Sequence, residues 1–380
     1  MVQRKKVTGH NIGVMFGTFA PLTLGHFYPT TIAKRENDSL LLIASGYTGD
    51  RGDQIGLNLQ KRFRYIRELF QDDPLVIVDK LDEDNIPQYP NGWEPWLNLL
   101  DTLIEKNSTE QNPNITIYVG EEIYVKKINE LRPNYSVRYI DRTIIPISAT
   151  MVRNNPGKHW NYISKPFKRH FTKKVLIMGG ASTGKTTLAI DLSKTFNSPW
   201  SPEYARAYQE DSNVADEELN GNDYMYLYTG QYSQTSAIIE GDSNNGVIFA
   251  DSSAMTTRGY ELEYLSTKVE EGKNLVTEEQ KELLEKLYKT TIAREEWDVI
   301  FFVLPKSKYI DDGFRDMNMS NTYDRWDFSD KLISIVKDAG FEDKIVFLGE
   351  DSTEDNFFRD NYINAIKYIK EKLSVDIGQQ

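Results

Sequence analysis

The fold is decided by the stretch Val175-Leu176-Ile177-Met178-Gly179-Gly180-Ala181-Ser182-Thr183-Gly184-Lys185-Thr186-Thr187. Its four apolar residues predict a short buried strand, and its glycine-rich turn leads into a helix over Lys185–Leu192. The spacing is G-x-x-x-x-G-K-[ST], in the strand–turn–helix context that this motif requires. Gly179 and Gly184 permit backbone angles that a side chain would forbid, so the N–H groups of the turn and the positive end of the helix can surround a phosphate.

This pattern predicts a phosphate loop that binds a nucleoside triphosphate. Lys185 would reach the β- and γ-phosphates, and the Thr186 hydroxyl would ligate Mg²⁺. The alternative is a glycine-rich turn that only connects a strand to a helix. The nucleotide-binding residues predicted from the loop are Gly179, Gly180, Ala181, Ser182, Thr183, Gly184, Thr186 and Thr187.

Composition indicates a soluble globular protein, because 39% of the 380 residues are hydrophobic and 27% are charged. This length suits two domains of ordinary size. The formal charge of −12 makes nucleic acid an unfavourable partner, since an acidic surface repels a phosphate backbone. The sequence has no cysteine, which excludes disulfides, thiolate metal sites and cysteine nucleophiles. Gly13, Gly17 and Pro21 interrupt the apolar run after the basic start, so we expect neither a signal peptide nor a membrane span, and a cytoplasmic protein.

The first half of the chain alternates strand and helix patterns. This alternation predicts parallel βαβ units in a doubly wound sheet, which binds ligands beyond the carboxyl ends of its strands. The predicted strands are Ile12–Phe16, Leu40–Ala44, Leu75–Val78, Ile115–Val119 and Val137–Ile140. The predicted helices are one that ends near Lys34, Asn58–Phe70, Trp93–Lys106 and Glu122–Leu131.

The segment after the first strand reads Gly17-Thr18-Phe19-Ala20-Pro21-Leu22-Thr23-Leu24-Gly25-His26. A glycine turn lets backbone N–H groups approach a phosphate, and an imidazole at the start of the following helix can donate to it. A substrate phosphate can then attack directly, while the site supplies position and charge stabilisation. The pattern resembles the [HT]-x-G-H motif of the nucleotidylyltransferase superfamily, whose members attack the α-phosphate of a nucleoside triphosphate. The alternative is a histidine that only caps a helix. We therefore predict a catalytic His26, with Gly17, Thr18, Phe19, Thr23 and Gly25 binding the nucleotide.

A second segment, Pro146–Arg153, resembles the I-S-x-T-x-x-R element of the same superfamily. Ser148 is a good N-cap, and the helix that starts there offers free N–H groups to an anion. Arg153, one turn further along, suits a grip on a triphosphate, and we predict that Ser148 and Thr150 bind the nucleotide too. Taken alone, the segment is an ordinary capped helix with a surface arginine.

A proline- and glycine-rich loop over Asn85–Trp96 carries Trp93 and Trp96 into a helix. An indole on a rigid loop beside a nucleotide site can stack on a flat, electron-poor ring such as nicotinamide. The alternative is that both side chains anchor the loop to the core.

The order of these motifs resembles the NadR family, whose members join a nicotinamide mononucleotide adenylyltransferase domain to a ribosylnicotinamide kinase domain. The quoted elements are G-T-F-A-P…T-x-G-H, P-x-Y-P-N-G-W, D-R-T-I-I-P-I-S-A-T-x-x-R and the phosphate loop, and the resemblance covers nearly the whole chain. Some relatives begin with a helix-turn-helix repressor domain, for which this sequence has no room before its first strand, so no DNA-binding role is implied. Many relatives have histidine at the position of Thr23, so this chain lacks one imidazole donor there.

In the second half, Pro202–Tyr208 resembles a family E-Y-[AG]-R element placed by the substrate ribose. The resemblance implies that Glu203 accepts from sugar hydroxyls, that Tyr204 lines the substrate site and that Arg206 binds phosphate. The alternative is a surface helix that carries a glutamate and an arginine. Asp223 and Gln231, on a predicted helix over Asp223–Ile239, are further pocket candidates.

The predicted strand Val247–Ala250 ends at Asp251, where the Mg²⁺-organising aspartate of a phosphate-loop protein belongs. Asp251 could also act as a base toward a substrate 5′-hydroxyl, and the alternative is a simple turn residue at a strand end. Relatives tend to read D-T-D here, and Ser253 replaces the second acid. If that acid holds metal or ribose, the resemblance implies weaker kinase activity in this chain.

The strand predicted over Val299–Leu304 leads to Asp311-Asp312-Gly313-Phe314-Arg315, which resembles the family's D-G-x-R lid. The resemblance implies that a catalytic Arg315, together with Arg325, closes over the triphosphate and stabilises transition-state charge. The alternative is a polar loop with solvated arginines. A last strand over Ile345–Leu348 and a last helix over Asn356–Leu373 are predicted as structural.

The predicted fold class is α/β with two doubly wound parallel-sheet domains. Residues 1–165 would form a nucleotidylyltransferase-type Rossmann-like domain and residues 172–380 a P-loop kinase domain. The resemblance implies a bifunctional enzyme of NAD salvage that phosphorylates ribosylnicotinamide with ATP and Mg²⁺, then joins nicotinamide mononucleotide to AMP from a second ATP, forming NAD and pyrophosphate. Its partners would be these small molecules, without nucleic acid or membrane, and a homo-oligomer stays open.

Two other functions fit part of the sequence. Coenzyme A synthesis would pair phosphopantetheine adenylyltransferase with dephospho-coenzyme A kinase, but the P-N-G-W-x-x-W loop and D-G-F-R argue against it. A nucleotide-sensing protein with impaired catalysis is suggested by Thr23 and Ser253.

Overall fold

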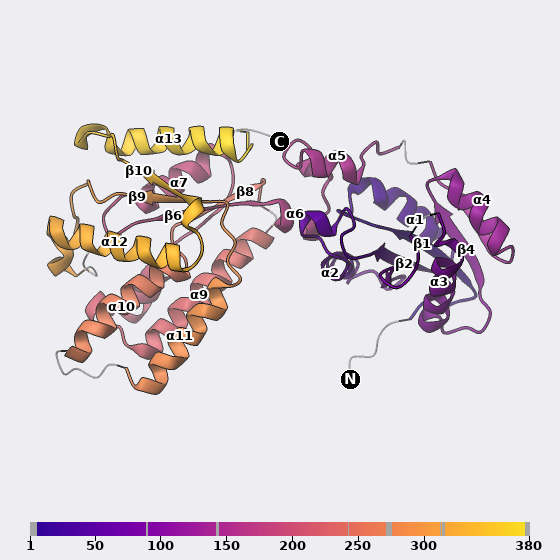
Figure 1. Ribbon diagram of the computed structural model, residues 1–380, viewed down its shortest axis with the longest axis horizontal. Coiled ribbons are helices and arrows are strands. Elements are labelled where there is room, and N and C mark those ends of the chain that lie inside the picture. The colour runs from indigo at the N-terminus through magenta and orange to yellow at the C-terminus, as the bar shows by residue number, and fades with distance from the viewer. Residues whose placement is uncertain are drawn as a thin grey trace. The chain divides into compact units, whose positions relative to one another are not determined.

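The structure is a computed structural model, and it describes residues 6–88, 90–141, 144–241, 243–270, 276–311, 313 and 316–376. The chain divides into two compact units, Met1–Phe171 and Thr172–Gln380. Each unit contains a five-stranded sheet whose strands pair in parallel (Figure 1). The predicted α/β class with two doubly wound parallel sheets is confirmed.

The first sheet has the strand order β3-β2-β1-β4-β5. All eight residues of β2 are buried, as expected for a strand covered on both faces. Leu40 and Leu42 face a core that includes Ile66 and Phe167, whereas Leu41 faces a second core on the opposite side of the sheet. The strands are β1 (Asn11–Gly17), β2 (Ser39–Gly46), β3 (Val76–Asp82), β4 (Asn114–Val119) and β5 (Ser136–Tyr139). The helices are α1 (Phe27–Arg35), α2 (Leu59–Leu69), α3 (Trp93–Asn107), α4 (Glu122–Leu131), α5 (Ala149–Asn154) and α6 (Lys165–Phe171).

The position of β1 determines where this unit can bind a ligand. In sequence order the strands run outward from β1 to β3 on one side, and β4 returns to the other side of β1. A parallel sheet has its crevice at such a reversal, beyond the carboxyl ends of the strands. The segment that leaves this end of β1 is Gly17–His26, which contains the predicted motif.

The second sheet has the order β10-β9-β6-β8-β7, with β6 at its centre. Helices α7 and α13 cover one face, and α10 and α12 cover the other (Figure 1). The strands are β6 (Lys173–Met178), β7 (Trp200–Ser201), β8 (Val247–Ala250), β9 (Val299–Val303) and β10 (Ile345–Leu348). The helices are α7 (Lys185–Thr195), α8 (Tyr204–Ser212), α9 (Gly221–Glu240), α10 (Ala254–Glu270), α11 (Glu278–Ile292), α12 (Thr322–Asp338) and α13 (Phe357–Lys372).

Several elements of the second unit were not predicted from the sequence. These are β7, which has only two residues, and helices α10, α11 and α12. Buried side chains of α9, α10 and α11 form a small core away from the sheet, so α10 packs on more than one side. A helix buried on several sides lacks the single apolar stripe by which sequence periodicity is recognised.

The residues between the two predicted domains belong to helix α6. Its Phe167 is fully buried in the core of the first unit, beside Tyr65. One residue, Thr172, separates the end of α6 from the start of β6. In the part of the chain that the structure describes, every helix is too short or too polar to cross a bilayer.

Candidate active sites

The first unit has a cavity of about 500 Å³ at the carboxyl end of β1, which we call the His26 pocket. It brings together two predicted motifs that lie more than a hundred residues apart in the sequence. The predicted residues that line it are Gly17, Thr18, Phe19, Gly25, His26, Ser148, Thr150 and Arg153. Ser148 caps α5, its hydroxyl accepting from the Met151 N–H at 3.1 Å. Arg153 donates to the Ala20 carbonyl at 2.6 Å and to Thr150 Oγ1 at 2.8 Å.

The proton on His26 can be placed from its contacts with Thr23. The backbone N–H of Thr23 donates to His26 Nδ1 at 3.0 Å. Because an N–H can only donate, Nδ1 is the unprotonated nitrogen, and in the neutral ring the proton is on Nε2. The imidazole is therefore held as a donor through Nε2.

Thr23 has a different contact from the nucleotide contact that we predicted. Its side chain is fully buried, and its hydroxyl lies 3.0 Å from His26 Nδ1. We expected a contact with the nucleotide, but the geometry makes Thr23 a support for the imidazole. Threonine at this position therefore supplies no second donor to the pocket. The sequence motif does not distinguish a threonine that contacts the nucleotide from one that supports the imidazole.

A second cavity of about 280 Å³, the Trp93 pocket, adjoins the His26 pocket. The two share Phe16, Gly17, Thr18 and Tyr124 in their walls. Trp93 and Trp96 both line the second cavity, as predicted for a ring-stacking site. Trp96 is fixed by an edge contact with Phe16 at 4.6 Å and by donation from its Nε1 to Ser45 Oγ at 3.3 Å.

Sequence analysis missed Arg51, which lines the His26 pocket from the loop after β2. Its guanidinium donates to Thr18 Oγ1 at 2.8 Å. Arg51 also lies close enough to Arg153 to lower its pKa, in addition to the larger effect of burial. Two guanidinium groups that repel each other favour a ligand with more than one negative charge. A signal was available in Asp50-Arg51-Gly52, at the carboxyl end of the strand beside β1.

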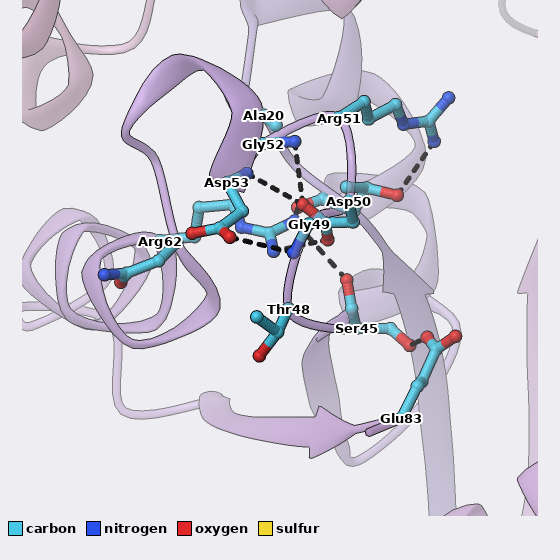
Figure 2. Close-up of polar contacts among 12 residues, drawn as sticks. Ala20, Ser45, Thr48, Gly49, Asp50, Arg51, Gly52, Asp53, Arg62 and Glu83 are labelled. Carbon is cyan, nitrogen blue, oxygen red and sulfur yellow. Dashed lines mark hydrogen bonds and ion pairs between the residues drawn. The ribbon is translucent and has the colours of Figure 1, made fainter. Parts of the chain in front are cut away.

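A buried ion pair holds the Arg51 loop. Figure 2 shows Asp50 between the Arg62 guanidinium and the amide groups of Gly52 and Asp53. Arg62 is 0% exposed and donates to Asp50 Oδ2 at 2.6 Å and to the Thr18 carbonyl at 2.7 Å. A Cβ at Gly46 would lie 2.2 Å from Asp50 Oδ2, so only glycine leaves room for the pair.

In the second unit the phosphate loop has the predicted strand–turn–helix form. Gly179 has φ +149°, and a Cβ there would lie 2.5 Å from the Val303 carbonyl oxygen. Ser182 and Gly184 also have positive φ angles, of 57° and 87°. Lys185 is 7% exposed, and its Nζ donates to the Gly180 carbonyl at 2.9 Å.

Asp251 lies directly against this loop, as predicted. It is 1% exposed, and its Oδ2 accepts from Thr186 Oγ1 at 2.5 Å. Burial raises the pKa of Asp251 to about 7, against the opposing charge of Lys185. Its Oδ1 is buried without a hydrogen-bond partner among the described residues. A carboxylate oxygen without a partner beside a hydroxyl is a donor set that fits Mg²⁺, which takes few protein ligands and keeps water or phosphate oxygens.

Among the described residues, no three or more His, Cys, Asp or Glu side chains form a group that could hold a metal ion by themselves. Ser253, which replaces an acid of the family pattern, is buried at the start of α10. Its Oγ accepts from the Met255 N–H at 3.2 Å. The residue therefore caps α10.

A narrow cavity, the Lys185 pocket, begins at the phosphate loop. Its free volume is about 50 Å³, far below the roughly 300–1,000 Å³ of typical small-molecule sites, so side chains must move apart before a nucleoside enters. The predicted residues that line it are Ala181, Lys185, Thr186, Glu203, Arg206 and Gln231. Lining residues that the sequence did not indicate include Gln209, Asp216, Tyr224, Thr256 and Tyr260.

Two predicted substrate residues, Asp223 and Tyr204, do not line the Lys185 pocket. Asp223 caps α9, accepting from the Asn220 N–H at 2.7 Å and from the Tyr208 hydroxyl at 2.6 Å. Tyr204 packs on α9, where a Cβ added at Gly230 would lie 2.2 Å from its ring.

Of the two predicted arginines, Arg325 lies on α12 and donates to the Ser307 carbonyl at 2.5 Å. Its Nε and Nη2 are buried without hydrogen-bond partners among the described residues. Ser307 in turn donates to the Ser182 carbonyl of the phosphate loop, so Arg325 lies near the predicted triphosphate. Arg315 lies outside the described residues.

These features define a class: an α/β protein with two parallel-sheet units, each carrying a phosphate-binding site at its central strand. Comparison with known proteins is more specific. A crystal structure of NadR protein in complex with NR has a TM-score of 0.85 and 39% sequence identity, covering 98% of this chain and 99% of that one. A NadR structure in complex with NAD and AMP-PNP has a TM-score of 0.83 and 38% identity over the same shares of the two chains. The chain belongs to the NadR family.

Two further matches agree with this assignment. The trifunctional NAD biosynthesis/regulator protein NadR of Salmonella typhimurium is 26% identical over 373 residues, which is 96% of this chain and 83% of that protein. A family model described as an AAA domain matches residues 174–351. The resemblance seen in the sequence is therefore confirmed.

Proposed function

We propose that the two units catalyse consecutive reactions on one pyridine metabolite. The second unit would phosphorylate ribosylnicotinamide with ATP, and the first would join the resulting mononucleotide to AMP from a second ATP, giving NAD and pyrophosphate. The observation that carries this proposal is the Trp93 pocket, which opens beside the His26 pocket and supplies a ring site next to a phosphate site.

Relatives support the same pair of substrates. One NadR structure contains NR, and another contains NAD together with AMP-PNP, an analogue that stands in for ATP. The related protein of Salmonella typhimurium is described as an NAD biosynthesis protein. At 38–39% identity over almost the whole chain, we infer that this protein takes the same ligands.

In the kinase unit, the 5′-hydroxyl of the nucleoside attacks the γ-phosphorus, and ADP leaves. Asp251 would accept the hydroxyl proton or, with Thr186, hold Mg²⁺, and an ion held there would supply positive charge toward the phosphates. Lys185 and the loop amides hold the β- and γ-phosphates, and Arg325 adds positive charge from α12. The resemblance assigns the same role to Arg315, which lies outside the described residues.

In the adenylyltransferase unit, a phosphate oxygen of the mononucleotide attacks the α-phosphorus of ATP, and pyrophosphate leaves. The Nε2–H of His26 donates to the phosphate on which charge develops. Arg51 and Arg153 bind the remaining phosphates, and Trp93 or Trp96 stacks on the nicotinamide ring.

The proposal is tested by incubating the full chain with ATP and Mg²⁺, and either ribosylnicotinamide or nicotinamide mononucleotide. We expect NAD from both. The Lys185→Ala variant should form NAD only from the mononucleotide, and His26→Ala should accumulate the mononucleotide from ribosylnicotinamide. Binding without turnover would overturn the proposal in favour of a sensor, and turnover of phosphopantetheine would overturn it in favour of coenzyme A synthesis.

A further inference from the structure

The Lys185 pocket contains polar groups that the phosphoryl transfer itself does not use. Tyr224 is 0% exposed and Thr256 is 1% exposed, and both line the cavity. Neither Tyr224 Oη nor Thr256 Oγ1 has a hydrogen-bond partner among the described residues. A buried hydroxyl without a partner costs free energy, so a ligand that supplies the partner is the simplest explanation for both.

Charged side chains of both signs line the pocket, Lys185 and Arg206 together with Glu203 and Asp216. Lys185 lies at the phosphate loop, where Asp251 faces it. Asp216 lines the same cavity, and Glu203 and Arg206 lie near enough to act on both carboxyl groups. Among the described residues, Asp216 accepts hydrogen bonds from uncharged donors, the Gln209 side chain at 2.9 Å and the Asp316 N–H at 3.4 Å.

Asp216 is therefore a carboxyl group in a place that disfavours its charge. Burial raises its pKa, and Glu203 acts in the same direction, while Gln209 and Arg206 oppose the effect. A cation bound beside it would offset this cost, because the attraction between opposite charges becomes stronger as burial removes water.

We propose that Asp216, supported by Tyr224, makes the Lys185 pocket selective for nucleosides whose base carries a fixed positive charge. An N-ribosyl pyridinium has a permanent charge on its ring, whereas the ordinary purine and pyrimidine nucleosides are neutral near pH 7. The unpartnered hydroxyls of Tyr224 and Thr256 supply hydrogen bonds for an uncharged polar substituent such as a carboxamide. A carboxylate substituent would instead be repelled by Asp216. This inference rests on the proposed kinase function.

The experiment compares ribosylnicotinamide with its 1,4-dihydro form, which has nearly the same size and lacks the ring charge. We expect the wild-type chain to prefer the charged form in kcat/KM by about 100-fold, and Asp216→Asn to reduce this preference about 10-fold or more. The KM for ATP should stay unchanged in the variant. Glu217→Gln, at the exposed neighbouring residue, is the matched control and should keep the full preference.

Tyr224→Phe gives an independent measurement, because its effects on stability and on binding should have opposite signs. Removing an unpartnered buried hydroxyl should leave the melting temperature unchanged or raise it, while the KM for ribosylnicotinamide rises. If Tyr224 had only a structural role, its substitution would not raise the KM for ribosylnicotinamide while leaving the melting temperature unchanged or higher.

The inference is overturned if the wild-type chain phosphorylates both forms equally well, a result that needs no variant to fold. It is also overturned if Asp216→Asn phosphorylates ribosylnicotinamide with an unchanged preference for the charged form. If the wild-type chain phosphorylates neither form nor any other nucleoside, the proposed kinase function itself fails.

Discussion

At the scale of single residues, His26 and Thr23 form a pair in which one residue orients the other. The Thr23 N–H fixes the imidazole so that Nε2 carries the proton. We predict that His26→Ala lowers the kcat of adenylyl transfer by about 10²–10³-fold, the usual loss for one donor to a developing charge. Phosphorylation of ribosylnicotinamide should be unaffected, and both rates can be measured on the same preparation.

Thr23→Val is the matched control for that prediction. It removes the hydroxyl but keeps the backbone N–H that donates to Nδ1, so we expect a loss of less than about 10-fold, the effect of one modest hydrogen bond. A loss as large as that of His26→Ala would mean that the hydroxyl itself reaches the substrate.

Glu295 gives a prediction on pH. Its carboxylate accepts from the Ala254 N–H and from Trp297 Nε1, both at 2.9 Å, and burial raises its pKa from 4.5 to about 7. Because the folded state holds the proton more tightly than the unfolded state, this group stabilises the fold below pH 4.5. That stabilisation is lost as the pH rises toward 7, and its full size is on the order of 3 kcal/mol.

We therefore expect Glu295→Gln to remove this part of the pH dependence. Melting temperatures of the wild-type chain and the variant at pH 5 and pH 7.5 provide the measurement. The stability of the variant relative to the wild type should increase with pH, and parallel profiles for the two proteins would contradict the assignment.

Residues could be predicted from the sequence where a short motif fixes both identity and position. Lys185, Thr186 and His26 belong to such motifs, and each lies where its motif requires. Asp216 and Tyr224 were not predicted, because a short 3-10 segment and one turn of α9 bring them to the pocket through tertiary packing. Asp223, one residue from Tyr224, was chosen instead because sequence alone does not show which face of a helix meets a cavity.

At the scale of elements, the buried Arg62–Asp50 pair fixes the loop between β2 and α2 that presents Arg51. We predict that Asp50→Asn lowers the free energy of unfolding of the first unit by about 3–5 kcal/mol, because it leaves the Arg62 charge buried and uncompensated. Denaturant titration of the full chain would measure the change.

The double variant Asp50→Asn/Arg62→Met tests the cause of that loss. It removes the buried charge together with its partner, so it should recover much of the lost stability. If the free energy of unfolding of Asp50→Asn lies within about 1 kcal/mol of the wild-type value, a water or another group compensates the Arg62 charge. The buried pair would then not be what stabilises the loop.

Strands of four or more residues were the easier elements to predict. The strands Val247–Ala250 and Ile345–Leu348 have the predicted bounds, because each is a short apolar run that ends at a turn. The strand predicted over Leu75–Val78 continues to Asp82, since Asp79 and Lys80 pair with β2 although they are polar. A strand predicted from a run of apolar residues ends at the first polar residues. The backbone hydrogen bonds between strands continue past them, because they do not depend on the side chains.

At the scale of the whole molecule, the two units have separate cores. The buried clusters of the first unit end at Phe167, with Phe171 packed against them, and those of the second begin at Val175. We predict that residues 1–171 and 172–380 fold when produced separately, the first forming NAD from the mononucleotide and the second phosphorylating ribosylnicotinamide.

A first fragment that ends at residue 164 is the matched comparison. It lacks Phe167, whose ring meets Tyr65 edge-on at 5.3 Å, and Arg169, which lies over the same tyrosine ring. Loss of one such buried aromatic side chain costs about 3–5 kcal/mol, so this fragment should unfold at a lower temperature than 1–171. Equal melting temperatures would show that α6 contributes little to the first unit.

The continuity of the chain from α6 into β6 also has a consequence for the supply of the two units. One messenger and one round of translation deliver both halves together, so their molar ratio is always one to one. A cell that needs more of one step than of the other cannot obtain it by changing expression. The balance of flux through the two steps must then be set by their turnover numbers and by the concentrations of their substrates.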